Sequence, residues 1–138
     1  MSDNTNTLGS EGDALRGVLK AFPDLEVAVL FGSLARGDAG AQSDVDLAVR
    51  FRRPLTPERK MTLIDALAEV AGRPVDLVDL HRAGEPLLGR ILREGILLHG
   101  TSSDRAALVY RHLVDQEDFG PIRRHMLEGR RRAWIGNL

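Results

Sequence analysis

The 138-residue sequence has no cysteine, few aromatic residues and no long apolar run. The absence of cysteine excludes disulfides, thiolate metal sites and a cysteine nucleophile. No apolar stretch approaches the roughly 20 residues that a membrane-crossing helix needs. The polar segment from Met1 to Ser10 lacks the cationic and apolar parts of a secretory signal, so we expect a cytoplasmic protein.

The rest of the composition is that of a globular protein with one core. Hydrophobic residues make up 43% of the chain and charged residues 28%, both ordinary proportions for a soluble domain. A chain of this length suits one domain rather than two. We expect a disordered lead over 1–11, a folded domain over 12–100 and a helical extension with a basic tail over 101–138.

The formal net charge of −1 conceals a basic C-terminus. Its basic residues are Arg123, Arg124, His125, Arg130, Arg131 and Arg132, and Glu128 is the one acid among them. Such a cluster could contact nucleic acid, contact an acidic protein or form a solvated helix face. The sequence leaves these three interpretations open.

Apolar spacing, prolines and glycines divide the chain into alternating elements. The pattern predicts helices over 12–22, 57–71, 86–94 and 103–117, and strands over 25–31, 44–51, 75–80 and 96–98. Ser103 is the expected N-cap of the last helix. This order indicates a small α/β (α+β) fold, in which helices pack on a mixed sheet of three to four strands.

A glycine-serine pair follows the strand over 25–31. Gly32 would let the backbone approach a phosphate closely, because it has no side chain. Ser33 is expected to cap a helical turn over 33–36 and to direct its backbone N–H groups at an anion. Arg36 could add a charged contact to phosphate, or it could pair with Asp38 at the surface.

Two aspartates begin the next strand, and ten residues separate Ser33 from the first of them. Because strand side chains alternate, Asp44 and Asp46 share one face, with Cα atoms roughly 6.5–7 Å apart. Paired carboxylates beside a phosphate turn suit Mg²⁺, which takes one or two carboxylates plus phosphate oxygens. Asp76, on a strand that could pair alongside, could hold a second metal or accept a proton. Asp79 lies an odd number of residues away and should face the other side.

These motifs resemble the minimal nucleotidyltransferases of the polymerase β superfamily over about residues 12–100. The resemblance is carried by Phe31 to Gly37, by Ser43 to Val49 and by Pro74 to Val78, with further similarity over Ile91 to Leu98. It implies transfer of a nucleoside monophosphate from a nucleoside triphosphate, with Mg²⁺ and release of pyrophosphate. By position, Asp44 and Asp46 would bind metal and Asp76 would be the third carboxylate and base. Gly32 and Ser33 would hold the triphosphate, and Arg36 and Ser43 are further candidate nucleotide-binding residues.

The small size and the helical extension are similar to MNT-domain antitoxins encoded beside HEPN-domain toxins. That resemblance implies ATP as the donor, a tyrosine of the toxin ribonuclease as the acceptor and a hetero-oligomeric complex. We expect no membrane association, and the resemblance favours a protein partner over direct nucleic-acid binding. Base preference, the number of nucleotides transferred and stoichiometry stay open.

Three alternatives remain. The acceptor could be a small hydroxyl compound such as an aminoglycoside, although the chain has little room for a domain to grip it. The chain could be an antitoxin that only binds, through its basic tail and Trp134, although a site without activity would be free to lose its three acids. A HEPN-like ribonuclease would use Arg105 and His112, but the expected polar partner after the histidine is missing. Tyr110 is expected in a core or interface.

Overall fold

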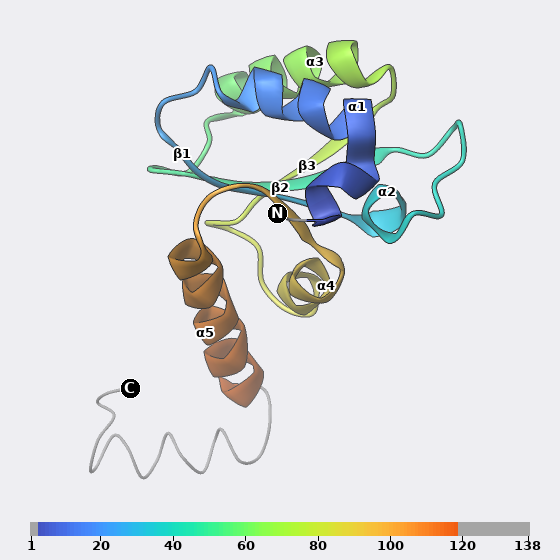
Figure 1. The fold of residues 1–138 in the computed structure, drawn as a ribbon. Helices are drawn as coiled ribbons and strands as arrows, with labels where there is room; N and C mark the ends of the chain where they lie inside the picture. The colour runs from blue at the N-terminus through green and yellow to red at the C-terminus, as the bar shows by residue number, and fades with distance from the viewer. Residues whose placement is uncertain (1–2, 119–138) are drawn as a thin grey trace, which may run out of the picture.

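The computed structural model describes residues 3–118, with side chains placed over 9–114. Five helices and four strands occupy this part of the chain (Figure 1). The helices are α1 (Asp3–Leu19), α2 (Gly32–Arg36), α3 (Pro57–Ala71), α4 (Leu87–Glu94) and α5 (Ser102–Asp118). The strands are β1 (Leu25–Phe31), β2 (Val45–Phe51), β3 (Val75–Asp79) and β4 (Ile96–His99).

The strands form one sheet in the order β3-β2-β1-β4. Strand β1 pairs antiparallel with β2 and with β4, whereas β2 and β3 are parallel. This arrangement confirms the predicted mixed sheet with its four strands. It also places β2 between β1, which leads to Gly32, and β3, which carries Asp76.

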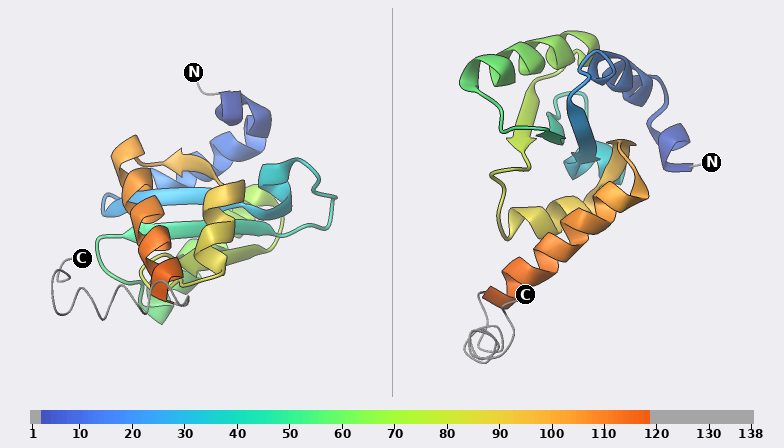
Figure 2. Two further views of the ribbon diagram at one scale, coloured as in Figure 1. Left: turned by 90° about the horizontal axis from the view of Figure 1, so that it is seen from below. Right: turned by 90° about the vertical axis from the view of Figure 1, so that its left-hand side faces the viewer.

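Helices cover both faces of the sheet, and each face has its own hydrophobic core. Helices α1 and α3 lie on one side and α4 and α5 on the other (Figure 2). The first core includes Leu15, Leu19, Leu47, Val49, Leu63 and Leu67. The second includes Val29, Phe31, Ala48, Leu88, Ile91 and Leu108. Because residues alternate along β2, Asp46 shares the α4 face with Ala48.

The residues predicted to start and end helix α3 do so in the structure. The Thr56 hydroxyl accepts a hydrogen bond from the backbone N–H of Arg59 at 3.1 Å, and Pro57 occupies the first turn, where its missing N–H is not needed. Gly72 ends the helix with φ 67°, a left-handed conformation that glycine adopts without steric penalty. The predicted start and end of this helix are therefore confirmed.

The first helix differs from the prediction at both ends. Helix α1 begins at Asp3, so it includes most of the segment expected to be a disordered lead, and it ends at Leu19 rather than at residue 22. Gly9, with φ 59° and ψ −137°, kinks the helix. Glu11 pairs with Arg73 at 2.7 Å, a long-range contact that ties this segment to the domain and that periodicity does not reveal. The division of the chain into three parts stays a prediction.

The start of the last helix is also different. Thr101, not Ser103, caps α5: its hydroxyl accepts from the Asp104 N–H, and the Asp104 carboxylate accepts from the Thr101 N–H. This reciprocal pair is a capping box, and it satisfies two backbone donors at once.

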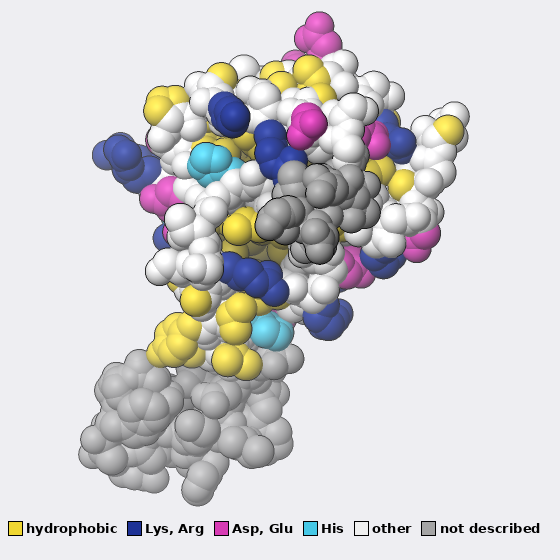
Figure 3. Space-filling view, in the orientation of Figure 1, with side chains coloured by type: hydrophobic (Ala, Val, Ile, Leu, Met, Phe, Trp, Pro, Cys, Tyr) yellow, Lys and Arg dark blue, Asp and Glu magenta, His cyan; other side chains and the backbone are white. Residues whose placement is uncertain are grey.

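Helix α5 packs on the domain through few of its hydrophobic side chains. Leu108 is buried in the second core, whereas Tyr110 and Leu113 are 60% and 55% exposed. Tyr110 is therefore not a core residue. Hydrophobic side chains gather where α5 leaves the domain (Figure 3). The basic cluster from Arg123 to Arg132, and Trp134, lie outside the described residues. Across the part of the chain that is described, no helix is long and apolar enough to cross a membrane.

Candidate active site

Gly32 directly follows strand β1, in a backbone conformation that only glycine adopts easily. Its φ is +77°, and a Cβ atom added to it would lie 2.1 Å from Oδ2 of Asp46. Real Cβ atoms do not come this close to a carboxylate, so no side chain fits here without moving Asp46. The absence of a side chain at Gly32 thus brings the turn into direct contact with the aspartate.

The short helix after this turn begins one residue earlier than predicted. Helix α2 starts at Gly32, and its N-cap, Phe31, makes no side-chain capping bond. Ser33 lies inside the first turn, where its carbonyl oxygen accepts from the N–H groups of Gly37 and Asp38. The prediction that Ser33 is the N-cap is therefore wrong, because the hydrogen-bonded turn already includes it.

Two of the three predicted acids are neighbours on adjacent strands. Asp46 of β2 and Asp76 of β3 are partners in the parallel register, and strands lie about 4.8 Å apart in a sheet. Asp44 precedes β2 by one residue and, like Asp76, is exposed to solvent. Asp79 is in register with Val49 of the first core and so faces away from Asp76, as predicted.

The charge around Asp46 is predominantly negative. Burial raises the pKa of Asp46, and the carboxylates of Asp76, Asp44 and Glu94 raise that pKa further, whereas Arg90 lowers it. Three carboxylates thus act on the half-buried Asp46 against one cation. A site with this imbalance favours a bound cation.

A fourth acid, Glu94, reaches the turn from the last residue of α4. Its Oε1 accepts from the Gly32 N–H at 3.1 Å, and its Oε2 accepts from Nη1 of Arg36 at 3.2 Å. Arg90, one helical turn earlier, donates to Oε1 at 3.3 Å and lies over the Phe31 ring. Neither residue is among the site residues predicted from the sequence. Their four-residue spacing on one helix indicates only that they can pair with each other, not that they reach Gly32.

The two remaining candidates, Arg36 and Ser43, already have hydrogen-bond partners within the protein. Arg36 pairs with Asp38 at 3.2 Å, the surface contact anticipated for it, in addition to Glu94. The Ser43 hydroxyl accepts from the Gly40 N–H at 2.9 Å within the loop before β2. Arg73 holds this loop by donating to the carbonyl oxygens of Gly40 and Ser43.

The donor set suits a divalent cation only when a second ligand supplies part of the coordination. Among the described residues, no three acidic, histidine or cysteine side chains form a ready-made metal group. Mg²⁺, however, is usually held by one or two carboxylates together with substrate phosphates and waters. Solvent-exposed Asp44 and half-buried Asp46, beside a turn that offers N–H groups, fit that mode of binding.

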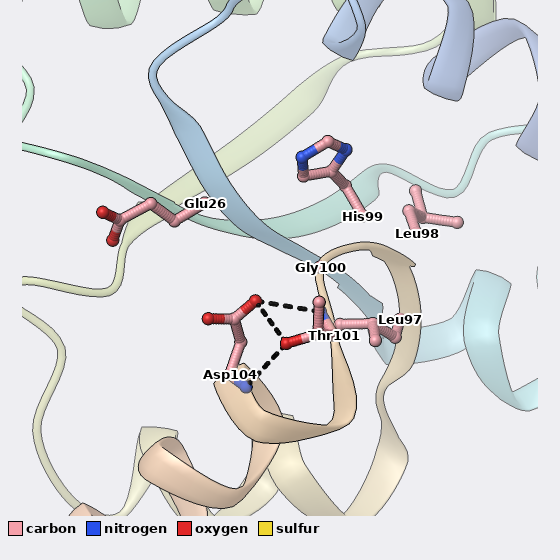
Figure 4. Close-up of a pocket in the computed structure, with 7 residues that line it drawn as sticks. All are labelled: Glu26, Leu97, Leu98, His99, Gly100, Thr101 and Asp104. Atoms are coloured by element: carbon pink, nitrogen blue, oxygen red, sulfur yellow. Dashed lines mark hydrogen bonds between the residues drawn. The ribbon is translucent and has the colours of Figure 1, made fainter.

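A separate hollow of about 530 Å³ lies at the other end of β1, between Glu26, His99 and Asp104 (Figure 4). Two acidic side chains that line it, Asp104 and Glu26, already have partners within the protein. Asp104 caps α5 through Thr101, and Glu26 pairs with Arg50 at 3.1 Å. We therefore place the candidate site at Gly32 and Asp46, where the acids and the turn meet.

A glycine turn pressed against an aspartate, with a second aspartate in register on the next strand, can hold a divalent cation beside a phosphate, as an enzyme that transfers a phosphorus-containing group requires. A family model described as "Polymerase beta, Nucleotidyltransferase" matches residues 13–104. The chain belongs to this nucleotidyltransferase family.

A curated relative and a solved structure are similar to much of this chain. The protein adenylyltransferase MntA of Shewanella oneidensis is 33% identical over 98 residues, which cover 67% of this chain and 70% of the relative. A chain of a toxin–antitoxin complex solved with AMP-PNP has a TM-score of 0.74 and 26% identity, and the match covers 86% of this chain and 96% of that one.

A further solved structure supports the fold alone. It contains a tri-AMPylated S. oneidensis HEPN toxin in complex with its MNT antitoxin. The matching chain has a TM-score of 0.70 and 24% identity, and the match covers 88% of this chain and 97% of that one.

Proposed function

We propose that this protein is a Mg²⁺-dependent protein adenylyltransferase that moves AMP from ATP to a hydroxyl of a HEPN-type toxin and thereby neutralises the toxin. The observation that carries the proposal is the contact of Gly32 with Asp46, together with the in-register pair of Asp46 and Asp76. The 33% identity to a protein adenylyltransferase supports AMP as the transferred group.

Each site residue has a role in this proposal. Asp44 and Asp46 hold Mg²⁺, which when bound neutralises charge on the triphosphate. Gly32 and Ser33 offer backbone N–H groups to the phosphates. Arg36 supplies a positive charge, and Ser43 shapes the loop that leads to Asp44.

Asp76 acts on the acceptor. The acceptor hydroxyl oxygen forms a bond to the α-phosphorus of ATP, and its proton passes to the Asp76 carboxylate. The bond between the α-phosphorus and the bridging oxygen breaks, and pyrophosphate leaves with the electron pair. Asp76 suits this role because it is exposed and stands next to Asp46, so an incoming hydroxyl can reach it.

The relatives favour a protein acceptor over a small molecule. Solved structures similar to this chain are components of toxin–antitoxin complexes, one of them with AMP-PNP. In the S. oneidensis pair the toxin carries AMP. A HEPN-type protein encoded next to this chain is therefore the proposed partner.

The decisive experiment incubates the chain with Mg²⁺, the partner toxin and ATP labelled at the α-phosphate. We expect label on the toxin, no label from γ-labelled ATP and no transfer after the metal is chelated. Asp44→Asn and Asp46→Asn should each lower transfer by about 100-fold or more, because each loses a charge that the metal requires. Both should still bind the toxin.

Asp65→Asn is the matched control, since Asp65 is an exposed aspartate on α3, on the opposite side of the sheet. It should transfer AMP at the wild-type rate. Label that comes only from the γ-phosphate would identify a kinase and contradict the proposal. Neutralisation of the toxin by Asp46→Asn at wild-type strength would instead identify an antitoxin that acts by binding alone.

A further inference from the structure

The carboxylate of Glu94 occupies the centre of a group of donors. The Gly32 N–H and the Arg90 side chain both donate to Oε1, at 3.1 and 3.3 Å, and Arg36 donates to Oε2 at 3.2 Å. The Glu94 side chain is only 21% exposed. One backbone N–H and two guanidinium groups thus converge on a single internal anion.

The same three groups are suitable ligands for a phosphate. Backbone N–H groups at a glycine and arginine side chains are the usual donors to phosphate oxygens in proteins. Gly32 is also the residue against which Asp46 rests, so a phosphate bound near Asp46 would lie beside this turn. A triphosphate at the proposed active site would therefore meet donors that Glu94 already uses.

We propose that Glu94 is an internal occupant of a phosphate seat formed by Gly32, Arg36 and Arg90, and that the triphosphate of ATP displaces it on binding. This proposal rests on the proposed function and adds two residues to it. Arg90 contacts a phosphate once Glu94 has been displaced. Glu94 is a positioning residue that holds the turn and both arginines in place before the nucleotide arrives.

The charges around Glu94 hold its carboxylate in place but leave it displaceable by another anion. Burial raises the pKa of Glu94, but the Gly32 N–H and the charges of Arg90 and Arg36 outweigh burial and lower that pKa below its usual value. Glu94 is therefore ionised at neutral pH. The two arginines are exposed, so their individual contributions are screened by solvent and a polyanion can compete for them.

The test measures the binding of inorganic tripolyphosphate and of AMP-PNP by calorimetry. Glu94→Gln keeps an oxygen for the Gly32 N–H but loses the negative charge, so both ligands should bind about three- to tenfold more tightly, the equivalent of one ordinary hydrogen bond. Glu69→Gln, at an exposed position on α3, makes the same change in net charge and should leave affinity unchanged.

Removal of a cation should have the opposite effect. Arg90→Gln should weaken the binding of both ligands about three- to tenfold. Arg53→Gln, at an exposed position beyond β2, is its control and should bind as the wild type does. Affinity that is unchanged or weaker in Glu94→Gln would overturn the inference, because Glu94 would then serve only to order the turn.

A readout on the wild-type chain avoids any folding defect of a variant. Addition of tripolyphosphate should shift the side-chain carboxylate resonance of Glu94 together with the Gly32 amide. A shifted amide with an unmoved Glu94 resonance would overturn the inference. Tripolyphosphate has no nucleotide to transfer, so its binding is measured independently of AMP transfer. Tighter binding to Glu94→Gln, with no AMP transfer by the wild type from labelled ATP, would reject the proposed function alone. AMP transfer by the wild type, without tighter binding of tripolyphosphate to Glu94→Gln, would reject the inference alone.

Discussion

Gly32 and Asp46 are packed so closely that a Cβ atom on the glycine would lie 2.1 Å from Oδ2 of the aspartate. The contact joins the end of β1 to the start of β2, whose pairing aligns Phe31 with Asp46. The turn that would bind phosphate and the acid that would bind metal are therefore one structural unit. A change in the backbone at either residue should affect both.

Gly32→Ala should abolish AMP transfer. A residue with a side chain at φ +77° costs about 1–2 kcal/mol, and the methyl group would also force the Asp46 carboxylate out of position. We expect a loss of transfer of about 100-fold or more with only a modest loss of stability, measured by α-labelled ATP and by thermal unfolding.

Gly72→Ala provides the matched comparison, because Gly72 has φ +67° and a methyl group added there would meet nothing within 4 Å. It should lose about 1–2 kcal/mol of stability and keep full activity. Equal losses of activity in the two variants would show that backbone strain, and not the contact with Asp46, explains the Gly32 result.

The part of the site that lies on strands could be predicted from sequence. Strand side chains alternate with a period of two, so the parity of Asp44, Asp46, Asp76 and Asp79 determines their faces once the strands are identified. The register that makes Asp46 and Asp76 neighbours follows from the parallel pairing of β2 with β3. The predicted sheet and the predicted faces of Asp76 and Asp79 are confirmed for this reason.

The contribution of α4 could not be predicted in the same way. Glu94 and Gly32 are 62 residues apart, and only the packing of α4 on the sheet brings them together. The pairing of Arg36 with Asp38 could be predicted because it is local. Helix ends are the weakest predictions. Ser33 and Ser103 both resemble N-caps, but the residues at the N-cap positions are Phe31 and Thr101, each two residues earlier.

Asp24→Asn should destabilise the protein at neutral pH but not in acid. Arg59 donates to both Asp24 carboxylate oxygens, at 2.7 and 2.9 Å, and this hydrogen bonding lowers the pKa of Asp24. The stabilisation is therefore fully present above the ordinary carboxyl pKa of 3.8 and is lost as pH falls through the lowered value. We expect a loss of about 0.5–1 kcal/mol at pH 7, measured by urea unfolding, that disappears in acid once pH has fallen below the lowered pKa.

Glu26→Gln is the control for this ion pair. Glu26 meets Arg50 at 3.1 Å, but both side chains are about two-fifths exposed, and the contact is single rather than double. Its loss should change stability by less than about 0.5 kcal/mol at any pH. A pH-independent deficit in Asp24→Asn would contradict the assignment of its effect to charge.

Asp76 and Asp79, three residues apart on β3, should respond to substitution in opposite ways. Asp79 is buried and accepts hydrogen bonds from the N–H groups of Leu55 and His81 and from the Arg82 side chain. Asp79→Ala would leave buried donors without partners, so it should lower the free energy of unfolding by about 2–4 kcal/mol. The folded fraction should retain its transfer rate.

Asp76→Ala should lose activity and keep its stability. Asp76 is exposed, and its negative charge repels that of Asp46. Its removal relieves this repulsion, so stability should stay the same or rise slightly, whereas transfer should fall by about 100-fold or more as the base is lost. Thermal unfolding and α-label transfer, measured on the same samples of both variants, separate the two effects. Loss of transfer in folded Asp79→Ala, with activity retained in Asp76→Ala, would mean that the face assigned to the active site is the wrong one.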